Sequence, residues 1–342
     1  MSEDPPKRIT IRDVAERAGV SHPTVSRALK GSPLVNKKTR DHIQRVADEL
    51  GYTPDPMLSA LVNYRNNFVS HNAKVRIAIV FREDLSEFYS ACSEVAQEQA
   101  ARLGYDFEIY IWDPETSAQR HSQILKSRGI KGIILGPLTH DFAMEHPEIS
   151  WDEFAVITIG RFIASPKLDS VSEDHFQAVR LCLEAAYSKG YERPGLLTNK
   201  RINIRAQDRI RGAFDSHMLK LPAAQRVSPF IGESDYTMAQ IKTWMQRERV
   251  DVIIGHRHIG RRLESEGLRI PGDISFIAFD KQTSQTGGHR FAGATHDDLE
   301  IARLAINNIN NHIISGKFGI PRSPQAILLE TYWSDGESFP KT

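Results

Sequence analysis

The chain has 342 residues, of which 40% are hydrophobic and 25% charged, and its formal net charge is +1. This length exceeds that of one ordinary core, so we expect two or three domains, and the near-neutral charge alone does not indicate a nucleic-acid partner. Cys92 and Cys182 lie far apart in the sequence, which argues against a disulfide framework and fits a cytoplasmic protein. The sequence shows no apolar signal segment and no run approaching the length of a membrane span, so we expect neither secretion nor a membrane partner.

Residues 1–53 are expected to form a small all-α domain. Thr10 is a typical N-cap for a helix over 11–18. Gly19 marks a tight turn, after which Ser21 caps a second helix over 23–30. This spacing predicts two short helices joined by a tight turn.

A third helix and a local excess of basic residues follow. Asn36 caps a helix that is expected to run to about Leu50. Between residues 27 and 45, Asp41 is the one acid among the basic residues Arg27, Lys30, Lys37, Lys38, Arg40 and Arg45. Such an excess suits a phosphate-contacting surface or a solvated helix face, and the charge pattern leaves both open.

Residues 54–73 separate this domain from the rest of the chain. Asp55 caps a short helix with Pro56 in its first turn, and Leu58 and Leu61 share one face of it. Residues 66–73 are expected to form a linker.

From residue 74 to 342 the pattern alternates between buried strands and amphipathic helices. Apolar runs predict strands at 75–81, 107–111, 132–135, 155–159, 195–197, 250–254 and 274–279. Helical patterns lie between them at 89–103, 118–128, 176–189, 207–219 and 238–247. This alternation predicts α/β architecture with parallel, doubly wound sheets covered on both faces.

Residues 11–29 have the pattern of a helix-turn-helix. Ala15 is small where two helices cross, Gly19 permits the turn, and Val14, Val20 and Val25 are suited to hold the helices together. Polar residues at the start of the second helix then reach base edges in the major groove of DNA. A helical bundle without DNA binding would share this core, so the pattern alone leaves that alternative open.

The stretch from Thr10 to Pro54 resembles the lac repressor-type (LacI/GalR) family. The resemblance is carried by Asp13-Val14-Ala15, Ala18-Gly19-Val20-Ser21, Thr24-Val25-Ser26-Arg27 and Leu50-Gly51-Tyr52, and it extends through 267–275 and Phe279-Asp280. It implies a ligand-responsive transcription regulator, most simply a repressor that binds a palindromic operator on double-stranded DNA as a homodimer. It also implies that the helix-turn-helix domain is followed by a two-lobed domain similar to periplasmic binding proteins.

The resemblance assigns DNA contacts to individual residues. His22 and Pro23 fall on the two positions that select the base sequence, and because Pro23 offers only apolar contact, His22 carries more of the readout unless it contacts phosphate. Leu61 matches a leucine that wedges into the minor groove, or it packs one hinge helix on its dimer mate. Asp55 is expected to cap the hinge helix rather than contact DNA. The other implied DNA contacts are Thr10, Ser21, Thr24, Ser26, Arg27, Lys30, Asn36, Lys37 and Thr39.

The resemblance also implies that a small-molecule effector lies between two lobes, with the chain crossing near 189, 294 and 323. The first lobe would comprise about 74–188 and 294–322, and the second about 189–293 and 323–336. Ligands of open α/β sheets lie at the carboxyl ends of strands. The implied effector contacts are Asp84, Ser86, Phe88, Arg161, Asp174, Arg209, Tyr236, His256 and Asp280, each with a surface or helix-cap role as its alternative. Arg209 is expected on one lobe, and Asp84 or Asp174 on the other.

One departure from the family pattern bears on the ligand. Gly255-His256-Arg257 stands where relatives carry Ala-Asn-Asp, so two cationic-capable groups replace an amide and an acid. This change favours an anionic, sugar-derived effector over a neutral sugar. The alternative is a ligand-independent regulator or activator with a vestigial cleft.

Other functional classes find little support in the sequence. It has no GxSxG, Walker A or HExxH motif and no clustered Cys/His spacing, so we expect no enzyme, no cofactor and no metal site. His256 and His258 are two residues apart without a third ligand nearby, which is a weak metal pattern. A transport binding protein would share the two lobes but would not carry residues 10–52.

Overall fold

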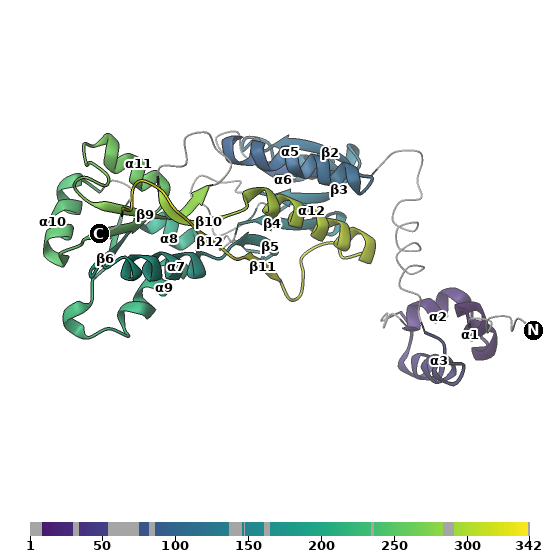
Figure 1. The fold of residues 1–342 in the computed structure, drawn as a ribbon. Helices are drawn as coiled ribbons and strands as arrows, with labels where there is room; N and C mark the ends of the chain where they lie inside the picture. Colours follow the sequence, from purple (N-terminus) through teal and green to yellow (C-terminus); the bar gives the residue numbers. More distant parts are fainter. Residues whose placement is uncertain are drawn as a thin grey trace, which may run out of the picture. The chain divides into compact units, whose positions relative to one another are not determined.

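The computed structural model describes residues 9–29, 34–53, 75–81, 86–136, 146, 148–160, 165–233, 236–282 and 291–340. The chain divides into two compact units, residues 1–69 and 70–342, shown in Figure 1. The expected hinge helix, with Asp55 and Leu61, lies outside the described residues, as do Lys30, Asp84 and Arg161. No helix among the described residues is long and apolar enough to cross a membrane.

The first unit contains three described helices, α1 (Ile11–Ala18), α2 (His22–Leu29) and α3 (Lys37–Glu49). Each contributes an apolar side chain to one small core, in which Val14, Val25 and Ile43 are fully buried. The three helices contact one another in pairs. The predicted all-α domain is therefore confirmed.

The turn between α1 and α2 depends on Gly19. This residue has φ of +66°, a left-handed conformation that glycine adopts without the steric cost of a side chain. Its N–H donates to the carbonyls of Ala15 and Glu16, and the N–H of Val20 donates to Ala15 at 3.1 Å. These bonds end α1 and fix the direction in which α2 begins.

The second unit contains two six-stranded sheets. In the first sheet every neighbouring pair of strands is parallel. Its strands, in spatial order, are β11 (Ala326–Leu329), β5 (Asp169–Glu173), β4 (Ala155–Ile159), β3 (Ile130–Leu135), β1 (Arg76–Phe81) and β2 (Asp106–Ile111).

Helices cover both faces of the first sheet. One face carries α5 (Ser86–Arg102) and α12 (Asp298–Ser315), which pack side by side although they are far apart in the sequence (Figure 1). The other face carries α6 (Ala118–Ser127), whose Leu125 is buried against Ala78 and Val80 of β1. A short 3-10 turn at Trp151–Glu153 leads into β4.

The second sheet has the order β12, β10, β9, β8, β6, β7. Its neighbours are parallel except for the antiparallel pair of β10 and β12. The strands are β6 (Pro194–Asn199), β7 (Phe230–Gly232), β8 (Val252–Gly255), β9 (Ser275–Gln282), β10 (Ala292–His296) and β12 (Tyr332–Ser334). The helices associated with this sheet are α7 (His175–Ser188), α8 (Lys200–Arg205), α9 (Arg209–Met218), α10 (Met238–Glu248) and α11 (Arg257–Ser265), with a 3-10 turn at Ala223–Gln225.

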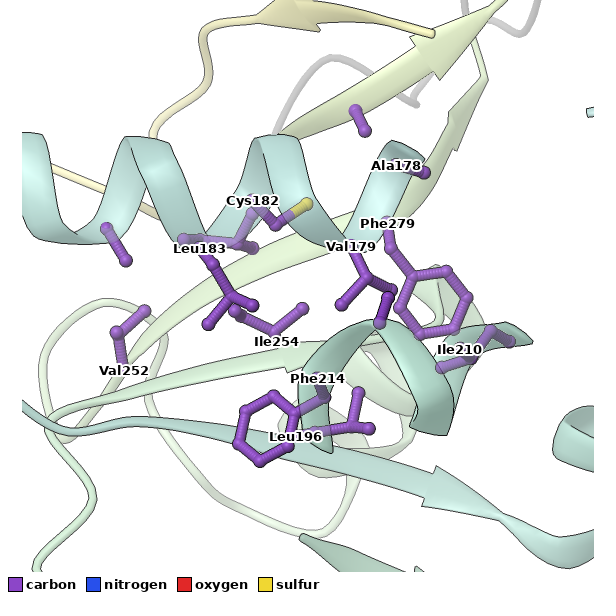
Figure 2. Close-up of a cluster of buried hydrophobic side chains, with 14 of the residues drawn as sticks. Ala178, Val179, Cys182, Leu183, Leu196, Ile210, Phe214, Val252, Ile254 and Phe279 are labelled. Atoms are coloured by element: carbon purple, nitrogen blue, oxygen red, sulfur yellow. The ribbon is translucent and has the colours of Figure 1, made fainter. Parts of the chain in front are cut away.

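Alternation along the strands builds a core on each face of the second sheet. Leu196, Ile254 and Ile277 point into the cluster formed with α7 and α9, part of which Figure 2 shows. Their chain neighbours Leu197 and Ile253 point into the opposite cluster, formed with α10 and α11. This period of two follows from the pleat of a strand and produces the predicted sheet covered on both faces.

The chain crosses between the sheets at positions that partly differ from the expected ones. The first crossing lies at Asp174 rather than near 189, because α7 buries Val179 and Leu183 against the second sheet. The second lies between β10 and α12, at about residue 297, close to the expected 294. The third lies between β11 and β12, at about residue 330 rather than 323, because β11 pairs with β5 in the first sheet. Two crossings are tied together, since the N–H of Thr331 donates to the Gln177 side chain at 2.8 Å and that side chain donates back to the Thr331 carbonyl at 2.9 Å.

Candidate functional site

The start of α2 forms an exposed polar surface. Ser21, His22 and Pro23 are all exposed, while Val25 on the other side of the helix is buried. The hydroxyls of Ser21 and Thr24 lie 2.8 Å apart and hydrogen-bond to each other. The hydrophobic core thus fixes the helix and leaves its first turn facing solvent, which is the arrangement that a major-groove reading helix needs.

Basic side chains are exposed on α2 and α3. Arg27, Lys37, Lys38 and Arg45 are exposed, whereas Arg40 is half-buried and donates to the Val35 carbonyl at 2.9 Å. The excess of basic residues therefore consists mostly of side chains available to phosphate, with Arg40 held in a structural contact.

Two of the expected DNA contacts also cap helices. Thr10 caps α1 in a reciprocal capping box with Asp13. The side chain of Asn36 accepts from the N–H of Thr39 at 2.9 Å and so caps α3. Both residues therefore have a structural role at a helix N-terminus, whether or not they also contact DNA.

A second candidate site is a pocket of about 310 Å³ at the carboxyl edge of the second sheet. It is lined by Asn199, Arg201, Ile202, Arg205, Tyr236, His256, His258, Ile259 and Arg262. These residues come from the end of β6, from α8, from the segment before α10, and from α11 and the residue before it. Among the described residues, none of those that line the pocket is acidic.

Arg262 is held in place on one side of this pocket. Its guanidinium lies 4.4 Å from the centroid of the Tyr236 ring and donates to the Tyr236 carbonyl at 2.7 Å. It also pairs with Glu266 at 2.6 Å, one turn further along α11. Tyr236 is itself 95% buried, so the aromatic ring and the cation form one fixed wall of the pocket.

Asp280 lies beneath the pocket and is neutralised from within the protein. Its carboxylate accepts from the backbone N–H of Arg257 at 2.7 Å, is ion-paired with the Arg257 guanidinium, and lies 2.8 Å from Nε2 of His256. Burial alone raises the pKa of Asp280, but His256 and Arg257 outweigh this effect and hold the pKa well below its ordinary value. His256 and Arg257 therefore already occupy the Asp280 carboxylate.

The imidazoles of His256 and His258 stack at the start of α11. Their ring centroids are 5.0 Å apart and their planes differ by 18°. Burial, and then the positive groups around it, lower the pKa of His258 to about 4. His258 is therefore neutral near pH 7 in the unliganded protein. The described residues include no group of three or more His, Cys, Asp or Glu side chains that could hold a metal ion.

Asp174 lies at the first crossing rather than on a lobe opposite Arg209, and Asp84, the other acid expected opposite Arg209, lies outside the described residues. Asp174 caps α7 by accepting from the N–H groups of Phe176 and Gln177, and Arg209 begins α9, which packs on α7. Both helices cover the second sheet, and the two charged groups are 3.9 Å apart. Asp174 therefore acts as a helix cap at the first crossing, paired with Arg209 from the same lobe.

The structure brings together only some of the residues expected to bind the effector. Tyr236 and His256 line the pocket, and Asp280 supports it from below. Ser86 and Phe88 lie at the start of α5, while Asp84 and Arg161 are outside the described residues. Sequence reasoning missed the pocket residues Asn199, Arg201, Arg205, His258 and Arg262. The basic segment Lys200–Arg205, directly after an apolar strand, was the signal that could have found Arg201 and Arg205.

Comparison with known proteins identifies both parts of the chain. Residues 10–55 match the model of bacterial regulatory proteins of the lacI family, and residues 74–221 match that of periplasmic binding proteins and the sugar-binding domain of the LacI family. The chain belongs to the LacI family. Its helix-turn-helix domain and its two-lobed domain, similar to periplasmic binding proteins, are the two parts of that family's architecture.

Individual relatives of this LacI-family chain are distant. The HTH-type transcriptional regulator KdgR of Bacillus subtilis is 24% identical over 94% of this chain and 95% of its own length. The regulator DegA of the same organism is 30% identical, but the match spans 45% of this chain and 44% of DegA. A lac repressor dimer bound to its operator and the anti-inducer ONPF has the same fold, with a TM-score of 0.54 at 16% identity over 97% of this chain and 99% of that one.

Proposed function

We propose that the protein is a ligand-responsive, sequence-specific DNA-binding regulator that acts as a repressor. Two copies bind a near-palindromic operator, and an anionic, sugar-derived metabolite in the pocket changes their affinity for it. One observation carries this proposal. The same LacI-family chain has an exposed first turn of α2 in one domain and a basic pocket in its two-sheet domain.

The DNA-binding part of the proposal rests on the surface around α2. His22 and Pro23 stand exposed at the start of that helix, where side chains of a recognition helix contact base edges. The exposed cations Arg27, Lys37 and Lys38 would neutralise phosphates on either side and supply binding that does not depend on sequence.

The homodimer proposal is supported by the edge strand β2. This strand is the last in its sheet, and Ile109 and Ile111 are 49% and 44% exposed on it. Leu103, just before the strand, is 39% exposed. Exposed apolar side chains along an unpaired strand edge favour burial against another chain, and a dimer would also supply the two DNA-binding domains that a palindrome requires.

The effector proposal rests on the charge of the pocket. Arg201, Arg205 and Arg262 line it, and the acid beneath it, Asp280, is already paired. Carboxylate or phosphate oxygens match the positive charge and the guanidinium geometry of these arginines better than the hydroxyls of a neutral sugar do. A ligand-independent regulator is the second candidate, and it is favoured by the internal neutralisation of Asp280, which needs no ligand.

Two measurements test the proposal. Selection of bound sequences from random DNA by the full-length protein should yield two half-sites related by a two-fold axis. One asymmetric half-site would contradict the operator proposal.

The effector proposal is tested by a thermal-shift screen of neutral sugars, sugar acids and sugar phosphates. Only the anions should raise the melting temperature of the protein, because a ligand that binds the folded state stabilises it. Stabilisation by neutral sugars alone would exclude the anionic effector, and no stabilisation by any of them would favour the ligand-independent regulator.

A further inference from the structure

We infer that an anion bound in this pocket is held together with a proton taken up by the imidazole of His258, so that a fall in pH strengthens effector binding. This inference rests on the proposed anionic effector and adds a means by which cellular pH modulates the response. It follows from the arrangement of the two imidazoles and of the charges that face them.

The two stacked imidazoles differ in their hydrogen bonds. His256 uses both ring nitrogens, since Nε2 lies 2.8 Å from the Asp280 carboxylate and Nδ1 accepts from the backbone N–H of His258 at 3.3 Å. This pattern fits an imidazole with its hydrogen on Nε2. The ring of His258 has no hydrogen-bond partner among the described residues, and it faces the pocket. His258 is therefore the imidazole that is free to gain a proton.

The charges around His258 are mostly positive in the absence of a ligand. Among the described residues, the acid that acts on the ring is Asp280 on β9, which is paired with Arg257. The other groups that face the ring or the same pocket are His256, Arg257, Arg261 and Arg262 on its own helix, Arg201 and Arg205 on α8, and Tyr236. Burial and this positive surrounding together keep the pKa of His258 at about 4.

A bound anion reverses the electrostatic part of this balance. Negative charge beside the ring favours the imidazolium form and raises the pKa of His258 toward or above the ordinary value of 6.5. Because the pKa is higher in the liganded protein, binding takes up a proton at any pH between the two values. Affinity for the anion therefore rises as the pH falls through the pKa of the liganded protein, and levels off near about 4, the pKa of the unliganded protein.

Isothermal titration calorimetry at about pH 6 tests this coupling, with inorganic sulfate, glucarate and gluconate as probes. Sulfate and the sugar carboxylates, whose pKa is about 3.5, remain ionised there, so any change in protonation belongs to the protein. Each titration is run in two buffers with different ionisation enthalpies. We expect the apparent binding enthalpy of the anions that bind to differ between buffers by an amount equivalent to uptake of about 0.5–1 proton.

Two variants locate the proton. His258→Gln should abolish the dependence on buffer and weaken binding about 10-fold at this pH, because the cationic form of the ring is lost. His217→Gln is the matched control: His217 is another histidine with a lowered pKa, and it stacks on Tyr187 outside the pocket. This control should retain both the affinity and the proton uptake of the wild type.

The outcomes separate the inference from the proposal beneath it. Anion binding with equal enthalpies in the two buffers would keep the anionic effector and overturn the proton coupling. Proton uptake that persists in His258→Gln would place the proton on another group and overturn the role of His258. Failure of all three anions to bind the wild type would overturn the anionic pocket and the coupling with it.

Discussion

The DNA-reading surface and the effector pocket are built in opposite ways. The surface comes from one short segment, since Ser21, His22 and Pro23 follow one another at the start of α2 and are held by the turn at Gly19. The pocket is assembled from residues between Asn199 and Arg262, at the ends of strands and on the helices that follow them. These residues are far apart in the sequence and come together through the pairing of β6 with β8. Local signals therefore determine the first site, and long-range strand pairing determines the second.

This difference predicts how each site responds to substitution. The side chains of His22 and Pro23 are exposed on a preformed helix, so changing one should leave its neighbours in place. At the pocket, Asp280, His256 and Arg257 form one network, so changing one leaves the others with unpaired buried groups. Effects should be separable at the DNA surface and coupled at the pocket.

The largest expected effect is that of Asp280→Asn on stability. The substitution removes the charge of the buried Asp280 and leaves the half-buried Arg257 without its counter-charge, which costs about 3–5 kcal/mol in comparable buried pairs. Chemical denaturation of the full-length protein measures the loss. Glu184→Gln, at the exposed ion pair with Arg180 on α7, is the control and should cost well under 1 kcal/mol.

The contribution of Asp280 also has a defined pH dependence. Because the folded protein holds the pKa of Asp280 below the ordinary 3.8, this stabilisation is complete above that value and is lost as the pH falls below it. Wild type and Asp280→Asn should therefore differ most near neutral pH and converge in strong acid. A constant difference across the acid range would show that Asp280 is not charged in the folded protein.

A somewhat smaller effect is expected for Ile43→Ala in the first unit. Ile43 is fully buried in the core of a three-helix domain, and an Ile→Ala change in a core costs about 2–5 kcal/mol. A domain of this size has little stability to spare, so operator binding should be lost while ligand binding in the second unit remains.

Ile277→Ala is the matched variant in the second unit. Ile277 is equally buried, in the cluster under α7. Because this larger unit buries more apolar surface, Ile277→Ala should lower the melting temperature without abolishing either activity. Equal loss of both activities in Ile43→Ala would show that the two units do not unfold separately.

The smallest expected effect is that of His22→Ala on operator choice. A base contact from one side chain contributes about 1–3 kcal/mol of discrimination at the base pair that it reads. Binding titrations against operators mutated one base pair at a time should show relaxed preference at one or two positions in each half-site. A uniform loss across all sequences would mark His22 as a phosphate contact.

Sequence alone predicted most of the fold because the buried strands are apolar and the helices have clear starts. Thr10 and Asn36 cap the helices where expected, and the run at Ala155–Ile159 is a strand with those bounds. It missed β5, whose residues Asp169–Glu173 have only one large apolar side chain.

The pocket was predicted less completely than the DNA-reading surface, because it depends on long-range strand pairing. Tyr236 and His256 matched family positions, but the role of Arg205 depends on how α8 leaves β6, which no local pattern encodes. The pairing of Asp280 on β9 with Arg257 at the start of α11 joins residues 23 positions apart and so required the pairing of β8 with β9. Sequence reasoning found the unusual segment Gly255-His256-Arg257, but it did not predict that His256 and Arg257 neutralise Asp280.

The central claim is that occupancy of the pocket changes affinity for DNA, and one titration tests it most directly. Fluorescence anisotropy of the selected operator is measured with the full-length protein, with and without a saturating anion from the thermal-shift screen. Allosteric couplings of this kind change affinity by about 5–150-fold, and we expect the anion to change the operator affinity of the wild type within this range. The anion should not change the operator affinity of Arg205→Ala. Without the anion, this variant should bind the operator as tightly as the wild type does. Identical operator affinity for the wild type with and without the bound anion would contradict the claim.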